Sequence, residues 1–310
     1  MSGLRSQSAT TTVAAPLLGW TMRRRLVPYL FFAPTLLALL AMYAYPIGQA
    51  FFVSLHRDSL GTRIGDFIGL ENFVAVLTQP LFPELLFNTV VYTVGVVVCV
   101  WVLGVVTALL LFRTFPGRFL ARGLVILPWA VPVVPVVASW QWLLNFDYGL
   151  FNAITHGLGF DRLDMLAASP GAMITVILVT SWKLFPLASV MFLAALQTIP
   201  DELYEAAEID GANDWQQFLN VTLPGLRSVS MFVILLMTVT IFGRAFTIIL
   251  LLTGGGPAGT TEVLALQTYH EAFQYFRMGS ASALGMVVLA ISLCITTLYL
   301  TLLFRRKDEA

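Results

Sequence analysis

Residues 205–224 read EAAEIDGANDWQQFLNVTLP, and this acidic stretch lies between two long apolar segments of the chain. Six acidic side chains occur between residues 201 and 214, whereas no Lys or Arg occurs between Lys183 and Arg227. A helix that only lies on an anionic membrane surface is usually rich in Lys and Arg. The absence of cations therefore favours a surface that faces a protein partner over an interfacial helix that caps the bundle.

The same stretch predicts a helix, a glycine turn and a second short helix. Pro200 suits the start of a helix, and Asp201 and Glu202 would lie in its first turn, where the helix dipole favours negative charge. Gly211 can take the left-handed conformation that ends a helix, and a second helix could begin near Asn213. The apolar side of that second helix would consist of Trp215, Phe218 and Leu219.

The composition is that of a membrane protein. Of the 310 residues, 58% are hydrophobic and 11% are charged, whereas about a quarter are charged in an ordinary soluble domain. The net charge is zero, and we expect no nucleic acid as a partner. Cys99 and Cys294 lie in apolar runs, which favours buried thiols over a disulfide framework.

The sequence also excludes several kinds of catalytic or cofactor site. It has three histidines and no CxxC or HExxH pattern, so we predict no metal site. It has no GxxxxGK[ST] motif, so it does not bind ATP through a P-loop. We assign no catalytic residue to this chain and expect it not to be an enzyme.

Apolar length predicts an all-α polytopic membrane protein with six spans, because about 20 apolar residues cross the hydrocarbon core. The predicted spans are about 27–53, 88–112, 120–144, 171–196, 226–252 and 279–304. We expect a disordered cytoplasmic tail at 1–25, a transmembrane domain at 26–305 that includes a polar loop at 200–224, and a second cytoplasmic tail at 306–310.

The distribution of Lys and Arg predicts that both termini and the acidic loop are cytoplasmic. One side would hold Arg23, Arg24, Arg25, Arg113, Arg118, Arg122, Arg305, Arg306 and Lys307. The other would hold Arg57, Arg63, Arg162 and Arg277, spread over longer loops. The acidic residues of the 197–225 loop do not oppose this orientation, since Asp and Glu contribute little to it.

Backbone breaks and buried cations mark the middle of the bundle. The third span holds Pro128, Pro132 and Pro135, and each proline frees a carbonyl one turn earlier. The result is either a kinked packing helix or broken backbone beside a translocation cavity. Lys183 either pairs with a carbonyl, such as that of Trp182 before Pro186, or lines a substrate path.

Arg244 and the glycine-rich segment after the fifth span also leave alternatives open. Arg244 either extends outward to the membrane surface or faces the cavity. Residues 253–257, TGGGP, are by themselves a tight loop.

Three motifs together resemble the permease subunits of ABC importers. The first is E-A-A, three residues, G, nine residues and V-T-L-P at 205–224; the second is LAALQTIPDELYEAAEIDGA at 193–212. The third, LTGGGPAGTTEVLALQTYHEAF at 252–273, is similar to a loop of the larger, maltose-type permease subunit of carbohydrate importers. The second motif and the run from Trp182 through Pro186 are similar to the same subunit. The resemblance covers about residues 26–305. Arg244 stands where the family often has Lys, and Thr247 where it often has Asp.

The resemblance implies a type I permease fold and a multi-subunit complex in the inner membrane of a prokaryote. The partners would be a second, similar permease, two ATPase subunits that bind ATP and Mg, and an extracytoplasmic solute-binding protein that meets the loops at 56–86, 145–169 and 253–278. The residues that couple to the ATPase would be Glu205, Ala206, Ala207, Asp210, Gly211, Leu223 and Pro224. The candidates for the sugar path are Asn145, Trp182, Lys183, Arg244, Phe246 and Thr247.

Two other functions compete with an ATP-driven sugar importer. A secondary transporter or channel acting alone would need intramembrane carboxylates and detectable inverted repeats, and the predicted spans show neither. A non-transporting scaffold would use the acidic loop only for docking, and Lys183 and the proline-rich third span argue against it. Disaccharide, oligosaccharide and glycerol-phosphate substrates all remain open from the sequence.

Overall fold

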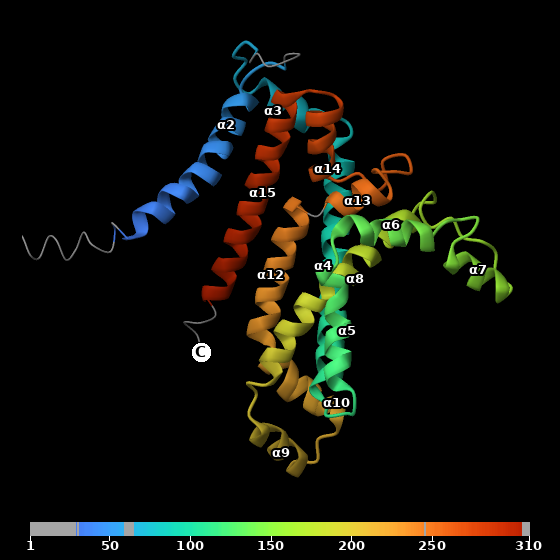
Figure 1. Ribbon diagram of the computed structural model, residues 1–310. Helices are drawn as coiled ribbons and strands as arrows, with labels where there is room; N and C mark the ends of the chain where they lie inside the picture. The colour runs from blue at the N-terminus through green and yellow to red at the C-terminus, as the bar shows by residue number, and fades with distance from the viewer. Residues whose placement is uncertain (1–28, 30, 59–64, 245, 306–310) are drawn as a thin grey trace, which may run out of the picture. The chain divides into compact units, whose positions relative to one another are not determined.

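The computed structural model describes residues 29, 31–58, 65–244 and 246–305, which fall into two compact units that divide between Ala50 and Phe51. The predicted tails at 1–25 and 306–310 lie outside the described residues. The elements, shown in Figure 1, are η1 (Leu40–Ala44), α2 (Tyr45–Ser54), α3 (Glu71–Thr78), α4 (Phe82–Phe112), α5 (Arg118–Ala130), α6 (Val133–Leu143), α7 (Leu150–Gly157), α8 (Gly171–Leu196), α9 (Asp201–Ile209), α10 (Asp214–Gln217), η2 (Phe218–Thr222), α11 (Leu223–Gly225), α12 (Arg227–Arg244), α13 (Phe246–Leu252), α14 (Leu264–Tyr269), η3 (His270–Gln274) and α15 (Met278–Arg305).

The described chain has between four and six of the six predicted spans. Four helices are long and apolar enough to cross a membrane: Phe31–Ser54, α4, α8 and Met278–Thr301 of α15. Two more spans result if each bent pair of helices is counted as one span. The first pair is α5 and α6, with a bend of 97°, and the second is Asp214–Gly225 and Arg227–Gly243, with a bend of 65°. The third span is therefore turned by nearly a right angle at its prolines.

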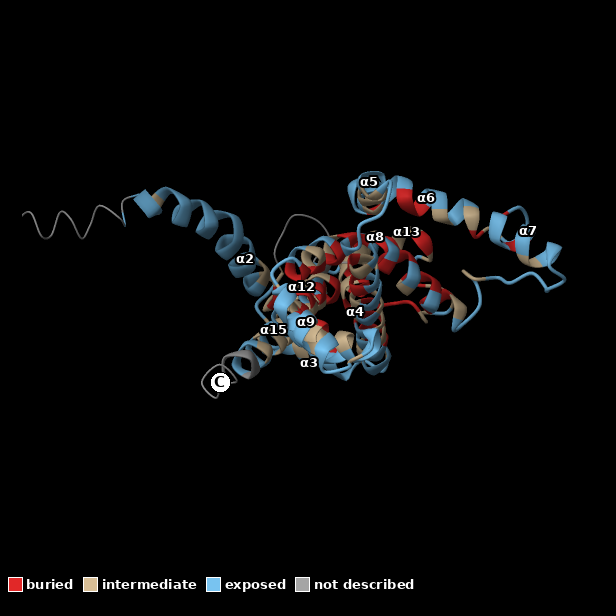
Figure 2. Ribbon diagram, turned by 90° about the horizontal axis from the view of Figure 1, so that it is seen from below, coloured by how far each residue is buried: buried red, intermediate tan, exposed pale blue. Residues whose placement is uncertain are grey.

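The core of the second unit forms where α4 packs against α8. Two glycines allow this close approach, since a Cβ at Gly104 would lie 2.9 Å from the Ala188 Cβ, and one at Gly95 would lie 2.7 Å from Ile177 Cδ1. Small residues at helix contacts are a common way to pack spans in lipid, where the hydrophobic effect does not drive association. Buried residues gather on α4, α8, α12 and α13 (Figure 2).

The two ends of α4 contact different polar segments. Near its N-terminal end, Asn88 and Thr89 bond to residues 259–264, and near its C-terminal end residues 101–113 border a groove with residues 204–222. A helix of 31 residues is about 46 Å long, longer than the hydrocarbon core of about 30 Å. The 253–263 loop and the acidic stretch therefore lie at opposite ends of a membrane-spanning helix (Figure 1).

Candidate functional site

Residues 201–225, called the acidic segment below, form the helix–glycine–helix that their sequence predicts. Asp201 and Glu202 lie in the first turn of α9, and Gly211 follows the helix with a φ of +80°. The next helix begins at a reciprocal capping box, in which the Asn213 side chain accepts from the Gln216 N–H and the Gln216 side chain accepts from the Asn213 N–H, each at 2.9 Å. The segment then continues through the π-helix η2 into α11.

The acidic segment is exposed in this chain, both at its carboxylates and at several apolar side chains. Glu205, Ala206, Asp210 and Gly211 are exposed, and Ala207 is half-buried. Four large apolar side chains of this segment are also exposed: Leu203 (52%), Ile209 (87%), Trp215 (65%) and Leu219 (41%). The sequence did not predict that Ile209 is part of an apolar surface, because it is a single isoleucine among acidic residues. Exposed apolar groups rimmed by charge are typical of a protein interaction surface.

The acidic segment is held by one contact between its own two arms and by another with Ile199, which follows α8. The Tyr204 hydroxyl lies 3.0 Å from the Thr222 hydroxyl, which joins α9 to η2. A Cβ at Gly225 would lie 2.6 Å from Ile199 Cδ1, so the two ends of the segment approach closely. Leu223 is half-buried, and Pro224 borders a small cavity of about 320 Å³ beside Ile199.

A larger, mainly apolar groove of about 630 Å³ separates the acidic segment from α4. Trp101 of α4 and Arg113, which follows α4, border it on one side, and Trp215 and Phe218 border it on the other, with their ring centroids 5.4 Å apart. The acidic segment continues through α11 into α12, and α12 packs against α4, so a displacement of the segment would reach α4 through α12.

Lys183 of α8 takes the carbonyl-pairing alternative, with partners that the sequence did not identify. Its Nζ donates to the carbonyls of Pro128 at 2.9 Å, Trp129 at 3.0 Å and Val131 at 2.5 Å. These groups lie at the break between α5 and α6, not at Trp182. A lysine ammonium has three N–H donors, and the three carbonyls match that number.

The other candidates for the sugar path lie in three separate places. Trp182 is partly exposed on α8, and its ring meets that of Trp140 on α6 edge-on, with centroids 5.5 Å apart. Asn145 follows α6, and its Oδ1 accepts from the N–H groups of Asp147 and Tyr148 at 2.9 and 3.3 Å. Asn145 thus organises a turn, while also bordering a cavity of about 530 Å³.

Phe246 and Thr247 lie at the start of α13, and both are half-buried. Phe246 borders a cavity of about 320 Å³ together with Tyr269 and Phe273. The ring centroids of Phe246 and Tyr269 are 5.6 Å apart, and those of Tyr269 and Phe273 are 5.2 Å apart. Arg244 ends α12, and its side chain lies outside the described residues.

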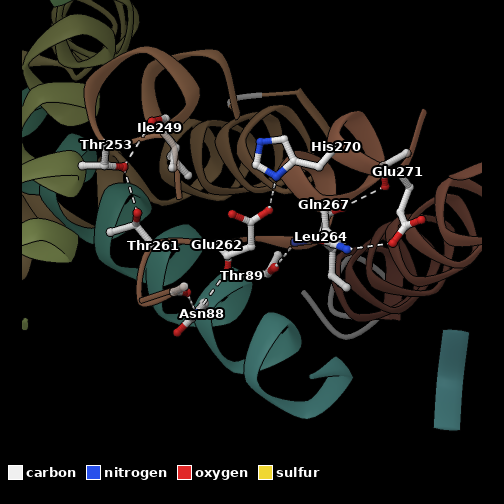
Figure 3. A network of polar contacts seen from close by, with 12 residues as sticks. Asn88, Thr89, Ile249, Thr253, Thr261, Glu262, Leu264, Gln267, His270 and Glu271 are labelled. Atoms are coloured by element: carbon white, nitrogen blue, oxygen red, sulfur yellow. Dashed lines mark hydrogen bonds and ion pairs between the residues drawn. The ribbon is translucent and has the colours of Figure 1, made fainter. Parts of the chain in front are cut away.

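The 253–274 region holds a buried polar network that the sequence analysis missed (Figure 3). Oε1 of Glu262 lies 2.9 Å from Nδ1 of His270, and these side chains are only 10% and 9% exposed. Gly255 makes room for this pair, because a Cβ there would lie 1.8 Å from Glu262 Oε2. Asn88 and Thr89 of α4 bond to the backbone of the same loop. Gly255 of the TGGGP turn therefore lies directly against the carboxylate of an acid–histidine pair.

Replacement of Glu262 by Gln is expected to alter the pH dependence of stability. Burial raises the pKa of the Glu262 carboxyl to about 7 and lowers the pKa of His270. Since the Glu262 pKa is raised on folding from 4.5, its stabilising contribution is complete below that pH and is lost as pH rises to about 7. The pH dependence of His270 has the opposite sign. Because its pKa is lowered on folding, its contribution to stability is complete above pH 6.5 and is lost as the pH falls below that value.

The measurement is Tm of the purified wild type and of Glu262→Gln at about pH 5, 6 and 7. Glu262→Gln keeps His270 and removes only the titrating carboxyl. From about pH 5 to about pH 7, the Tm of the wild type should fall by a few °C relative to the Tm of the variant. This corresponds to a loss on the order of 1 kcal/mol in the free energy of unfolding. Parallel Tm curves would show that Glu262 does not titrate there.

Comparisons with known proteins agree over nearly the whole chain. Residues 101–308 match the family described as binding-protein-dependent transport system inner membrane component. The trehalose/maltose transport system permease protein of Thermococcus litoralis is 35% identical over 283 residues, which cover 90% of this chain and 94% of that protein. The sn-glycerol-3-phosphate transport system permease protein of Rhizobium meliloti is 33% identical over 275 residues, with coverages of 88% and 92%.

A solved structure shows the same fold. A chain of a bacterial alginate ABC transporter, crystallised in complex with an alginate pentasaccharide-bound periplasmic protein, superposes with a TM-score of 0.79 at 23% identity. The match covers 90% of this chain and 94% of the other. The arrangement of helices is thus that of an ABC importer permease.

Proposed function

The chain belongs to the family of binding-protein-dependent transport system inner membrane components, and we propose that it forms half of the path of an ATP-driven importer for a di- or oligosaccharide. The observation that carries this proposal is the exposed acidic segment, whose spacing matches the ATPase-contacting loop of ABC importer permeases. Its exposed carboxylates and apolar side chains in this single chain fit a surface that a partner covers.

The proposed complex contains a second permease, two ATPase subunits and an extracytoplasmic solute-binding protein. ATP and Mg bind to the ATPase subunits, and hydrolysis takes place there. The acidic segment and both termini are cytoplasmic in this proposal, and the 253–278 loop faces the binding protein from the opposite end of α4. Closure of the ATPase dimer would move the acidic segment and with it α4 and α12, and so bias the permease between two states.

A neutral sugar fits the described part of the path better than a phosphorylated polyol. The three carbonyls that surround the Lys183 ammonium occupy its donors, so it has none left for a phosphate. Phe246, Tyr269 and Phe273 border one cavity, and aromatic faces of this kind can stack on the apolar face of a sugar ring. The named relatives transport trehalose and maltose in one case and sn-glycerol 3-phosphate in the other.

The decisive experiment is reconstitution of the purified permeases, ATPase and binding protein into liposomes. Uptake of radiolabelled maltose is expected only with ATP on the ATPase side and with the binding protein present, and sn-glycerol 3-phosphate should not compete. Competition by the phosphate would overturn the sugar assignment. Solute or ion flux through this chain alone, without ATP, would favour the alternative of a channel or secondary transporter.

A further inference from the structure

The Lys183 ammonium occupies a cage of backbone carbonyls between two elements of the bundle. Pro128, Trp129 and Val131 provide the carbonyls from the break between α5 and α6, which we call the elbow (residues 128–133). Lys183 belongs to α8 and is more than 50 residues further along the chain. The contact is therefore a tertiary bond between helices, made by one cation.

The prolines explain why these carbonyls need an outside donor. In a continuous helix the Pro128 carbonyl would accept from residue 132 and the Val131 carbonyl from residue 135, but both positions are prolines without an N–H. The chain instead turns by 97° between α5 and α6. Inside a bilayer such carbonyls must be satisfied by protein or by water in a cavity. The ammonium does this for three carbonyls of the elbow, those of Pro128, Trp129 and Val131.

The elbow determines where α6 lies, and α6 contacts the proposed sugar path on two sides. On one side, Trp140 meets Trp182 of α8 with ring centroids 5.5 Å apart. On the other, Gln141 Nε2 donates to the Leu251 carbonyl of α13 at 2.6 Å. Since α13 also carries Phe246, the elbow, α8 and the start of the path are connected through α6 (Figure 1).

We infer that Lys183 is a positioning residue of the transport path, a tethered cation whose three N–H donors hold the α5–α6 elbow against α8 and thereby set α6 and α13. It does not bind the sugar. This inference rests on the proposed importer function for its transport readout, but the contact itself can be tested without any sugar.

The transport test separates the effect of side-chain volume and charge at position 183 from the effect of the N–H donors. Lys183→Ala removes both and should lower the maximal uptake rate about tenfold, since three carbonyls of a span that crosses the bilayer lose their donor. Added n-propylammonium should restore much of the rate, whereas tetramethylammonium, which carries charge but no N–H donor, should not. Lys183→Arg should retain uptake and Lys183→Met should not, because both side chains fill the space and only arginine donates.

The opposite pattern would overturn the inference. A wild-type uptake rate in Lys183→Met would mean that Lys183 has no positioning role. A raised KM for sugar at an unchanged maximal rate would mean that Lys183 binds the sugar directly. If Lys183→Ala fails to reach the membrane, the comparison of Arg with Met still decides between the two outcomes.

A second measurement does not depend on transport. Cysteines introduced as Gln141→Cys and Leu251→Cys, in a background without Cys99 and Cys294, report the proximity of α6 and α13. Their disulfide yield should fall in Lys183→Ala and recover with n-propylammonium. If Lys183→Ala leaves the disulfide yield unchanged, Lys183 does not hold α6 near α13, whatever the uptake rate. If Lys183→Ala lowers the disulfide yield but the wild type takes up no sugar, only the importer proposal is contradicted.

Discussion

Glu205→Lys is expected to release the ATPase from the permease and to abolish ATP-driven uptake, while the chain remains in the membrane. Glu205 is exposed on α9, in a segment without any Lys or Arg, so its partner site should be basic or rich in backbone N–H donors. Charge reversal at a partner surface adds repulsion and leaves the partner's charge unpaired, which typically costs about 2–5 kcal/mol. Binding would then be weaker by at least about 30-fold.

The measurement is the amount of ATPase that co-purifies with a tagged permease, together with uptake in proteoliposomes. Glu84→Lys is the matched control, since Glu84 is an exposed glutamate in the first turn of α4, at the end of that helix remote from the acidic segment. The control should retain the ATPase. Equal retention by Glu205→Lys would mean that the acidic segment is not where the motor binds.

Apolar length predicted the two central helices well. The predicted span 171–196 coincides with α8, and 88–112 shares its C-terminal end with α4, which begins earlier at Phe82. The early start reflects Pro83 and Glu84, which favour a first helical turn although they lower local hydropathy. The fifth predicted span, 226–252, covers the residues of α12 and α13, and residue 245 between them lies outside the described residues.

Local sequence signals predicted the acidic segment, but they could not predict the tertiary contacts of Lys183. The proline start, the Gly211 turn and the second helix near Asn213 all depend on neighbours within a few residues, and they are present in the structure. The partners of Lys183 depend on how α8 packs against α5, and no spacing in the sequence encodes that. Three prolines indicated free carbonyls in the same chain, but not which cation would meet them.

The Glu262–His270 pair escaped prediction for a similar reason. The two residues are eight positions apart, Glu262 in the loop before α14 and His270 at the start of η3, so no periodicity of a single element places them on one face. A signal was nevertheless available, because a glutamate and a histidine lie among apolar residues directly after a glycine-rich turn. Gly255 supplies the space for the carboxylate, which explains one of the three glycines without any phosphate-binding role.

Gly104→Leu is expected to prevent the chain from folding, because α4 and α8 approach each other closely at this position. A Cβ at Gly104 would lie 2.9 Å from the Ala188 Cβ and 3.2 Å from Phe192 Cδ2, and both of those residues are fully buried. The Ala188 Cβ belongs directly to the helix backbone and cannot rotate away. Overpacking usually costs about 1–3 kcal/mol, and separation of the central helix pair should place the cost at the upper end or beyond it.

The matched control is Gly123→Leu, which makes the same change on α5 at an exposed position with no atom within 4 Å of the added Cβ. Fluorescence-detected size exclusion of the detergent-solubilised chain measures the folded fraction. Gly123→Leu should give the wild-type peak, because a leucine is as compatible with lipid as the surface around it. Gly104→Leu should lose most of that peak, and Gly104→Ala should lie between them. A wild-type peak for Gly104→Leu would mean that α4 and α8 can separate by the width of a side chain without loss of the fold, and the close glycine contact would then have no part in holding the core together.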